Sequence, residues 1–249
     1  MRAIITLTTD FGTADGYVGE LKGVLRSSAA DAEIIDITHD IPPQDVERAR
    51  LTVARVWRRF PVGSIHLVVV DPGVGSSRAA LAVASDGRFL VGADNGVLSP
   101  ALLIPGARVV ALHVPSSASA TFHGRDVFAP AAAALARGEP IDALGVEAPS
   151  PVIRRTPEPR RRADGAVEGE VILVDHFGNA MTNLFSLRGG TIEVGSTVIP
   201  IRRTYADARV GEPVAVVGST GFIEIAIRDG DAARALQLSS GTRVVLHTG

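Results

Sequence analysis

In the first half of the chain, short continuous runs of apolar residues alternate with segments in which apolar residues recur at helical spacing. Residues 3–9 and 65–70 are short, mostly apolar runs typical of buried strands, and residues 33–38 resemble a third strand. Residues 15–28 place their apolar side chains on one helical face. Strands that alternate with helices are typical of a mainly parallel sheet with helices on both faces. The pattern therefore predicts an α/β domain.

The same domain continues with a second helix and a hairpin. The second helix is predicted to begin at Asp45, with an acidic first turn and an apolar stripe that faces a sheet. A turn separates two further strands at residues 79–85 and 89–93. The last helix of this half is expected over residues 124–137, with Pro130 in its first turns, where a missing N–H is tolerated.

The composition changes near residue 150. Residues 151–165 are rich in proline, arginine and small residues and lack apolar periodicity, which is typical of a linker. Beyond them, glycine and proline separate short apolar runs at intervals typical of a small barrel or sandwich. Strands are expected at residues 167–174, 191–194, 197–200, 213–217 and 242–247, and one helix at 229–236. The predicted parts are an N-terminal α/β domain (1–150), the linker (151–165) and a smaller β-rich, barrel-like domain (166–249).

Composition and charge indicate a soluble protein that acts on a small ligand. The 249 residues are 46% hydrophobic and carry a formal net charge of −2, which gives no general attraction to nucleic acid or anionic membranes. Arg160, Arg161 and Arg162 could indicate nucleic acid, but a solvated linker face is the favoured interpretation. Because the chain has no cysteine, disulfides and thiolate chemistry are excluded.

The N-terminus runs straight into the first predicted strand, without the apolar core of a signal peptide. No apolar run approaches the roughly 20 residues that a membrane span needs. We therefore expect a cytoplasmic protein without a membrane segment.

The turn DPGVGSSR, residues 71–78, is the first candidate for chemistry. It follows the apolar run 65–70, and turns at the carboxyl ends of strands are where α/β sheets place their ligands. Asp71 and Arg78 bring a carboxylate and a guanidinium to this turn. Arg78 stands where a dinucleotide-binding fingerprint has its third glycine, and no Gly-Lys-Ser or Gly-Lys-Thr sequence follows. A phosphate loop is therefore not the favoured interpretation.

Two further segments of the first half combine polar residues with turn signals. Asp10 ends the first predicted strand, where its carboxylate could bind a vicinal diol such as a ribose or cap the following helix. Spacing alone leaves both interpretations open. His123 and Arg125 are predicted on an exposed turn before a helix. Because a lone histidine is more often structural than catalytic, His123 is a candidate only in combination with other residues.

Two segments of the second half have the same character. One holds Phe177 and Asn179, which could bind a nucleobase by stacking and hydrogen bonds, or could form a strand end that turns through Gly178. The other places Ser219 and Glu224 around a short apolar strand, where they could bind a ligand or make a turn. The sequence contains no metal-binding motif and no Gly-x-Ser-x-Gly elbow, so neither a metal site nor a serine hydrolase is predicted.

Seven motifs follow one another through nearly the whole chain. In order they are TLTTDFG, DITHDIPP, VVVDPGVGSSR, GADNGVLSP, TFHGRDVFAPAAA, DHFGNAMTN and GSTGFIEIA. Together they resemble the S-adenosylmethionine hydroxide adenosyltransferases, hydrolases that are related to the fluorinase and chlorinase. The resemblance implies hydrolysis of S-adenosylmethionine to adenosine and methionine without a cofactor. It also implies an α/β domain joined to a β-rich domain, and a homotrimer with active sites between subunits.

The resemblance also assigns roles to individual residues. In the hydrolases of that family an Asp, Arg and His set orients and activates water, and the matching positions here are Asp71, Arg78 and His123. The implied substrate-binding residues are Asp10 for the ribose hydroxyls, Phe177 and Asn179 for adenine, Asp175 and Ser219 near the amino-acid end, and Tyr205 and Glu224 at further pocket positions.

Two other functions stay open at this point. One is a halide-using adenosyltransferase, although the halogenases carry an aromatic residue at the position of Asp71 and a carboxylate there would repel a halide. The other is a sensor that binds adenosine or S-adenosylmethionine without catalysis, although a sensor would have no need of the Asp, Arg and His set. A small-molecule substrate is implied, and nucleic acid is not an expected partner.

Overall fold

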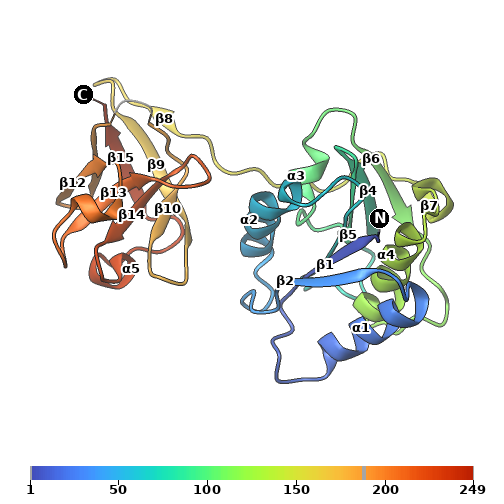
Figure 1. Cartoon of the computed structure of the whole chain (residues 1–249). Helices are drawn as coiled ribbons and strands as arrows, with labels where there is room; N and C mark the ends of the chain where they lie inside the picture. Colours follow the sequence, from blue (N-terminus) through green and yellow to red (C-terminus); the bar gives the residue numbers. More distant parts are fainter. Residues whose placement is uncertain (1, 187–188, 249) are drawn as a thin grey trace. The chain divides into compact units, whose positions relative to one another are not determined.

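The computed structural model describes residues 2–186 and 189–248, and the chain divides into two compact units, Met1–Arg154 and Arg155–Gly249 (Figure 1). Each unit encloses a hydrophobic core of its own. None of the helices within the described ranges has the length and apolar character that crossing a membrane requires.

The first unit is built on a sheet that has seven strands within the described part of residues 1–154. They are β1 (Ile4–Thr9), β2 (Glu33–Thr38), β3 (Ile65–Val69), β4 (Ala80–Ser85), β5 (Arg88–Ala93), β6 (Arg108–Leu112) and β7 (Gly145–Glu147). Their order is β2-β1-β3-β5-β4-β6-β7. The first four pair in parallel, whereas β4, β6 and β7 add an antiparallel extension. The predicted α/β fold class is confirmed.

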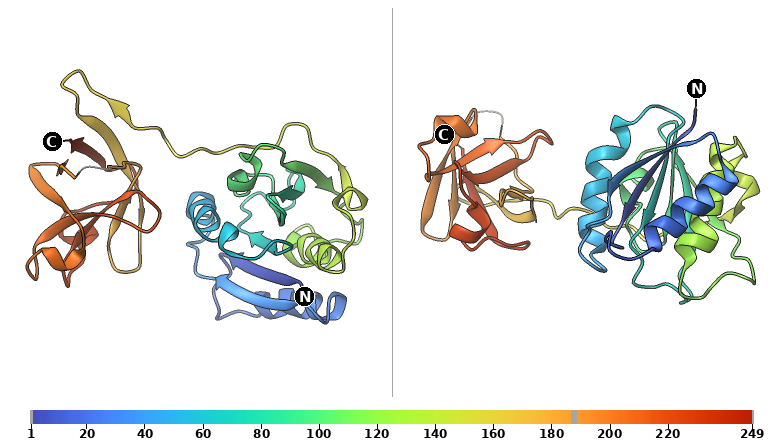
Figure 2. Two further views of the ribbon diagram at one scale, coloured as in Figure 1. Left: turned by 45° about the horizontal axis from the view of Figure 1, so that its top comes forward. Right: turned by 60° about the horizontal axis from the view of Figure 1, so that its bottom comes forward.

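Alternate side chains of β3 face opposite layers of this unit. Ile65, Leu67 and Val69 pack into a core with α1 (Tyr17–Ser28) and α4 (Ala129–Ala136), whereas Val68 and, directly after the strand, Val70 pack into a second core with α2 (Val46–Val56). Figure 2 shows these helices on the two faces of the sheet. The helical segments are α1 (Tyr17–Ser28), α2 (Val46–Val56), η1 (Trp57–Arg59), α3 (Ser99–Leu102), the π-helical turn η2 (Gly124–Phe128), α4 (Ala129–Ala136) and η3 (Ile141–Ala143).

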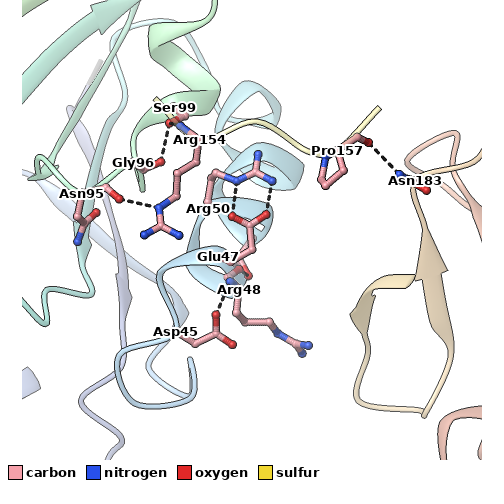
Figure 3. Close-up of polar contacts among 11 residues, drawn as sticks. Asp45, Glu47, Arg48, Arg50, Asn95, Gly96, Ser99, Arg154, Pro157 and Asn183 are labelled. Carbon is pink, nitrogen blue, oxygen red and sulfur yellow. Dashed lines mark hydrogen bonds and ion pairs between the residues drawn. The ribbon is translucent and has the colours of Figure 1, made fainter. Parts of the chain in front are cut away.

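Local sequence explains where two of these helices begin. The carboxylate of Asp45 accepts a hydrogen bond from the backbone N–H of Arg48 at 2.8 Å, which caps α2 as its position in the sequence predicts (Figure 3). Pro130 lies in the first turn of α4, where its missing N–H costs no helical hydrogen bond. α2 therefore starts at the predicted position, whereas the helix expected over residues 124–137 begins with a π-helical turn at residues 124–128 and becomes α-helical only at Ala129.

The loop between β3 and β4 crosses the end of β5, a strand that comes later in the chain. β3 and β4 are consecutive in the chain, yet β5 lies between them in the sheet. Because β3 and β5 are parallel, the loop that leaves β3 after Val69 crosses the carboxyl end of β5 before β4 begins at Ala80. This crossing loop contains Asp71 and Arg78.

The second unit is a closed barrel. Its strands follow the order β10-β14-β13-β12-β11-β15-β9-β8, and a further pairing of β10 with β9 closes seven of them into a ring. The predicted β-rich, barrel-like domain is confirmed. Its elements are β8 (Arg160–Arg161), β9 (Val167–Val174), β10 (Ala180–Thr182), β11 (Thr191–Val194), β12 (Thr197–Arg202), η4 (Tyr205–Asp207), β13 (Pro213–Val217), β14 (Ile223–Ile227), α5 (Ala232–Ala235) and β15 (Arg243–His247).

Two details of this unit differ from the expected elements. Arg160 and Arg161 belong to a strand that pairs with β9, so part of the arginine-rich segment has regular structure. The helix expected over residues 229–236 is shorter, because α5 begins only after Asp231, whose carboxylate caps it by accepting the backbone N–H of Arg234 at 2.8 Å.

Candidate active site

The candidate site of the first unit lies at the carboxyl ends of β1 and β3. These strands are parallel neighbours, so Asp10, which follows β1, and Asp71, which follows β3, emerge at the same edge of the sheet. Both line a pocket of about 260 Å³. The lining residues are Asp10, Phe11, Gln44, Val69, Asp71, Pro72, Val74, Thr121, Phe122, His123 and Gly124.

Arg78 joins Asp71 and His123 into one network. Its Nε donates to Oδ1 of Asp71 at 2.9 Å, and its Nη2 contacts Oδ2 of the same carboxylate. Nη2 also lies 3.0 Å from Nδ1 of His123. The side chains of Asp71 and Arg78 are only 6% and 10% exposed. The three residues predicted to act together are therefore in direct contact, in a site shielded from bulk water.

His123 is buried, which corrects the expectation of an exposed turn. It precedes the π-helical turn η2, is 8% exposed, and packs edge-on against the ring of Phe128. Burial, together with the positive charge of Arg78, lowers the pKa of His123 below its usual value, although Asp71 and Asp126 act in the opposite direction. Burial and Arg78 thus favour the neutral form of the ring.

The contact with Arg78 fixes the tautomer of this neutral ring. A guanidinium only donates hydrogen bonds, so Nδ1 of His123 must accept. The proton of the neutral ring is then on Nε2. His123 can thus donate one hydrogen bond from the nitrogen that Arg78 does not use.

Asp10 is not a helix cap, which closes one of the two interpretations left open by its position. α1 begins at Tyr17 after Gly16, and no side chain caps it. Instead, Oδ2 of Asp10 accepts the backbone N–H of Gln44 at 2.8 Å. Gln44 holds the left-handed φ of 67°, which an L-residue adopts at a cost. One carboxylate oxygen is thereby used to fix the loop, and the second is available for a ligand.

The motif DITHDIPP supports this loop. His39 is buried, and its Nδ1 lies 2.9 Å from the hydroxyl of Thr9, the residue before Asp10. The carbonyl of His39 accepts the backbone N–H of Gly12 at 2.8 Å. The chain on both sides of Asp10 is therefore tied to the segment that leads to Gln44.

Sequence reasoning missed the aromatic residues of the pocket. The rings of Phe11, Tyr17 and Phe122 pack against one another with centroids 5.5 to 5.7 Å apart, and Phe11 and Phe122 line the pocket. Phe11 directly follows Asp10 and Phe122 directly precedes His123, and this proximity to polar candidates could have identified them as pocket residues. Arg125 points elsewhere: it pairs with Asp126 and Glu20 and lies over the ring of Phe122.

In the second unit, Asp175 organises a turn. Its Oδ1 accepts the backbone N–H groups of Phe177 and Asn179, each at 2.9 Å, and its Oδ2 accepts Nδ2 of Asn179 at 3.2 Å. Gly178 takes φ 80° in this turn. These bonds account for a strand-end turn, and the same turn leaves Phe177 73% exposed. An exposed aromatic beside an amide is what stacking on a nucleobase requires.

Three residues of the second unit lie on or near β14. The hydroxyl of Tyr205 donates to Oε2 of Glu224 at 2.7 Å, and Glu224 is buried on the strand itself. Ser219 is exposed in the loop that leads into β14. The structure therefore brings Tyr205 and Glu224 together, and the carboxylate of Glu224 lies against Gly218, the residue before Ser219.

A larger pocket of about 520 Å³ lies in the first unit beside β6 and β7, lined in part by Arg108, Asp142 and Ile153. It contains no predicted site residue. Within the described ranges, no group of three or more His, Cys, Asp or Glu side chains is arranged to hold a metal ion.

Family models and named relatives match most of the chain. Models of the N-terminal and C-terminal domains of S-adenosylmethionine hydroxide adenosyltransferases match residues 5–145 and 169–245. An (R)-S-adenosyl-L-methionine hydrolase of Thermus thermophilus is 43% identical, over 99% of this chain and 100% of its own. One from Salinispora tropica is 38% identical over 98% of each chain. A fluorinase of Actinopolyspora mzabensis is more distant, at 27% identity over 98% of this chain and 96% of its own.

A solved structure shares the fold over nearly the whole chain. The crystal structure of an uncharacterized conserved protein from Thermotoga maritima has a TM-score of 0.88 and 33% identity, and the match covers 98% of this chain and all of that one. Both domain models match in order, and together they cover most of the sequence. This chain therefore belongs to the S-adenosylmethionine hydroxide adenosyltransferase family.

Proposed function

We propose that this protein is an enzyme that hydrolyses S-adenosylmethionine to adenosine and methionine. The observation that carries the proposal is that Arg78 contacts both Asp71 and His123 at the wall of a pocket that Asp10 also lines. Full-length relatives that bear the name of this hydrolase support the same reaction.

In the proposed reaction, the oxygen of a water molecule forms a bond to C5′ of the ribose while the bond between C5′ and sulfur breaks. Both electrons of the broken bond go to sulfur, so methionine leaves as a neutral thioether. The attacking water loses one proton to solvent as adenosine forms. Because the leaving group needs no acid, the task of the site is to align and activate water.

Asp71 and Arg78 are suited to that task. Arg78 donates to both oxygens of the carboxylate, which fixes its plane and leaves lone pairs that accept from water. The guanidinium also supplies positive charge where the attacking oxygen gains hydroxide character. The pair therefore orients the nucleophile and stabilises its developing charge.

His123 is suited to donate a hydrogen bond. Its Nδ1 is occupied by Arg78, and its lowered pKa favours the neutral ring. With its proton on Nε2 and the lone pair of Nδ1 engaged by Arg78, the ring has no free lone pair to take up a proton. We therefore assign His123 to hold the water or a substrate oxygen, and not to act as the base.

Asp10 and the second unit supply the substrate contacts of the proposal. The free oxygen of Asp10 accepts hydrogen bonds from the ribose hydroxyls. Fixing the ribose lowers the entropic cost of aligning water, C5′ and sulfur for in-line attack. Phe177 and Asn179 hold adenine, and Asp175, Ser219, Tyr205 and Glu224 complete the pocket. We propose that a homotrimer forms, in which the second unit of a neighbouring subunit contributes these residues.

The halide-using alternative is less well supported. The carboxylate of Asp71 lines the pocket where a halide would have to approach C5′, and like charges repel. The fluorinases are also more distant in sequence than the hydrolases.

The test is incubation with each sulfonium epimer of S-adenosylmethionine in ¹⁸O-water, followed by mass analysis of the nucleoside. We expect one ¹⁸O in adenosine and faster turnover of the (R) epimer, which the names of the relatives specify. Formation of 5′-chloro-5′-deoxyadenosine in chloride, without adenosine, would establish the halide alternative. Calorimetric binding without any turnover would establish a sensor.

A further inference from the structure

The motif GADNGVLSP, residues 92–100, has no part in the reaction described above, yet its asparagine contacts Val70, which lies between the end of β3 and Asp71. Nδ2 of Asn95 donates a hydrogen bond to the carbonyl of Val70, the residue before Asp71, at 2.9 Å. Oδ1 of Asn95 accepts the backbone N–H of Val97 at 3.1 Å. Both ends of the amide are therefore used, and the amide cannot turn without losing one of the two bonds.

The same turn holds the other end of the loop 71–78, here called the catalytic loop. The backbone N–H of Asp94 donates to the carbonyl of Ala79, the residue after Arg78, at 3.0 Å. This contact follows from topology, because the catalytic loop crosses the carboxyl end of β5 and Asp94 follows β5 directly. The catalytic loop is thus bracketed at the two points where it leaves the sheet.

The turn is itself fixed from its far side. The carbonyl of Asn95 accepts Nε of Arg154 at 2.9 Å, and the hydroxyl of Ser99 accepts the backbone N–H of Arg154 at 2.8 Å (Figure 3). Gly96 has φ 93°, and a Cβ there would overlap the Arg154 side chain. The residue that ends the first unit therefore holds the turn against the catalytic loop.

We propose that Asn95 is a positioning residue for the reaction. It acts by fixing the carbonyl of Val70, and with it the direction in which the carboxylate of Asp71 leaves the sheet. Val70 is fully buried and lies beyond the last residue of β3, so Asn95 supplies the hydrogen-bond partner that strand pairing no longer provides. The inference rests on the proposed function, since that function assigns the attacking water to Asp71.

The substitution Asn95→Asp tests the proposal. The aspartate keeps one oxygen for the N–H of Val97 but sets its other oxygen against the carbonyl of Val70, so that two acceptors face each other. We expect kcat per competent site to fall about 10- to 100-fold, as small misplacements of catalytic groups do. KM and the adenosine Kd should stay within about threefold. Calorimetric titration with adenosine counts the competent sites, so unfolded protein cannot imitate this result.

Asp94→Asn is the matched control. This substitution replaces a carboxylate by an amide at the adjacent residue. In the wild type the carboxylate of Asp94 accepts the N–H of Val152 at 2.7 Å, and the amide oxygen of the variant can still accept it. We expect its kcat to stay within about twofold of the wild type.

The following results decide between these possibilities. A wild-type kcat in Asn95→Asp overturns the proposal, and so does an equal loss in Asp94→Asn. If Asn95→Asp does not fold, Asn95→Ala removes the same donor without adding a charge, and its kcat per adenosine-binding site decides in the same way. A wild-type protein that releases no adenosine from S-adenosylmethionine contradicts the proposed function itself. An active wild type with an unaffected Asn95 variant contradicts only the positioning role.

Discussion

Arg78 makes three kinds of contact at once. It donates to the carboxylate of Asp71, it donates to the ring nitrogen of His123, and its guanidinium lies 5.3 Å from the centroid of the buried Phe128 ring. A buried guanidinium requires such partners, because an unpaired charge away from water is costly. The electrostatics of the site therefore depend on its members being present together, and single substitutions are expected to be far from additive.

Asp71→Asn is predicted to abolish turnover while leaving nucleoside binding intact. The amide keeps the size of the side chain but replaces one acceptor with a donor, so it neither pairs fully with Arg78 nor accepts from water as the carboxylate does. We expect kcat to fall about 10²- to 10⁴-fold, with the adenosine Kd, measured by calorimetry, within about threefold.

Asp86→Asn serves as the control for that substitution. Asp86 is also paired with an arginine, since its carboxylate accepts Nε of Arg58 at 2.8 Å, but it lies in the exposed β4–β5 turn. Its turnover should equal that of the wild type. Equal losses of rate and adenosine affinity in Asp71→Asn would assign Asp71 to binding instead.

Asp10→Asn is predicted to weaken adenosine binding. The amide oxygen can still accept the N–H of Gln44, so the loop keeps its anchor, while the NH₂ group faces the ribose hydroxyls in place of a carboxylate oxygen. Losing a hydrogen bond to a charged acceptor should raise the adenosine Kd about 10- to 100-fold. Asp31→Asn, on the exposed turn before β2, is the control. Unchanged calorimetric affinity in Asp10→Asn would remove this residue from the ribose site.

At the scale of elements, sequence pattern succeeded where a segment has a clear period and a local start signal. β3 and α2 are examples, because the first is a nearly continuous apolar run and the second begins at a capping aspartate. β7 and β10, each three residues long, were not predicted. β10 exists because β9 and β14 pair with it on either side, and such partners cannot be read from three residues.

In the candidate site, too, some contacts could be predicted from the sequence and others could not. Asp71 and Arg78 could be paired from sequence because they flank one turn. The burial of His123 could not be foreseen, since TFHGRD is a polar string and the contacts that cover it come from Phe128 and from Arg78, 45 residues earlier in the chain. The backbone contact between Gln44 and Asp10 was also missed, because it depends on how two loops pack.

A buried histidine in β3 is predicted to make the first unit sensitive to acid. Burial, reinforced by Arg88, lowers the pKa of His66 to about 4, and its Nδ1 lies 2.8 Å from the hydroxyl of Thr6. In an unfolded chain the pKa is near 6.5, so the unfolded state binds more protons between these values. Stability is therefore lost as the pH falls from about 6.5 to about 4, by about 3 kcal/mol in total.

Urea unfolding at pH 7, 5.5 and 4 measures this loss. His66→Gln should flatten the dependence of the unfolding free energy on pH across that window, whereas His113→Gln, which removes an exposed histidine of the same unit, is the control. An unchanged pH dependence in His66→Gln would rule out His66 as its source.

At the scale of the whole molecule, the proposed trimer makes a prediction about mixtures of inactive variants. Asp71→Asn disables the first unit, and Phe177→Ala removes the proposed adenine contact of the second. If each site combines the first unit of one subunit with the second unit of another, unfolding and refolding the two variants together at equal amounts should restore about one quarter of the wild-type activity. Light scattering should give about 78 kDa, three times the 25.9 kDa chain.

Activity regained in the refolded mixture would also exclude a site that is built by a single chain. A site that one chain builds alone would always contain one of the two substitutions, so no activity would return. Each variant refolded without the other is the control, and both should stay inactive.

The passage of the catalytic loop over β5 has a consequence for biosynthesis. β5 enters the sheet between two strands that precede it in the chain, so the space it fills must stay open until residues 88–93 have left the ribosome. Until β5 has formed, the catalytic loop has no strand to pack on, and the carbonyls of Val70 and Ala79 lack the hydrogen-bond donors that the turn after β5 provides. A nascent chain arrested short of residue 95 should therefore carry both Asp71 and Arg78 without the hydrogen bonds that fix the two ends of their loop.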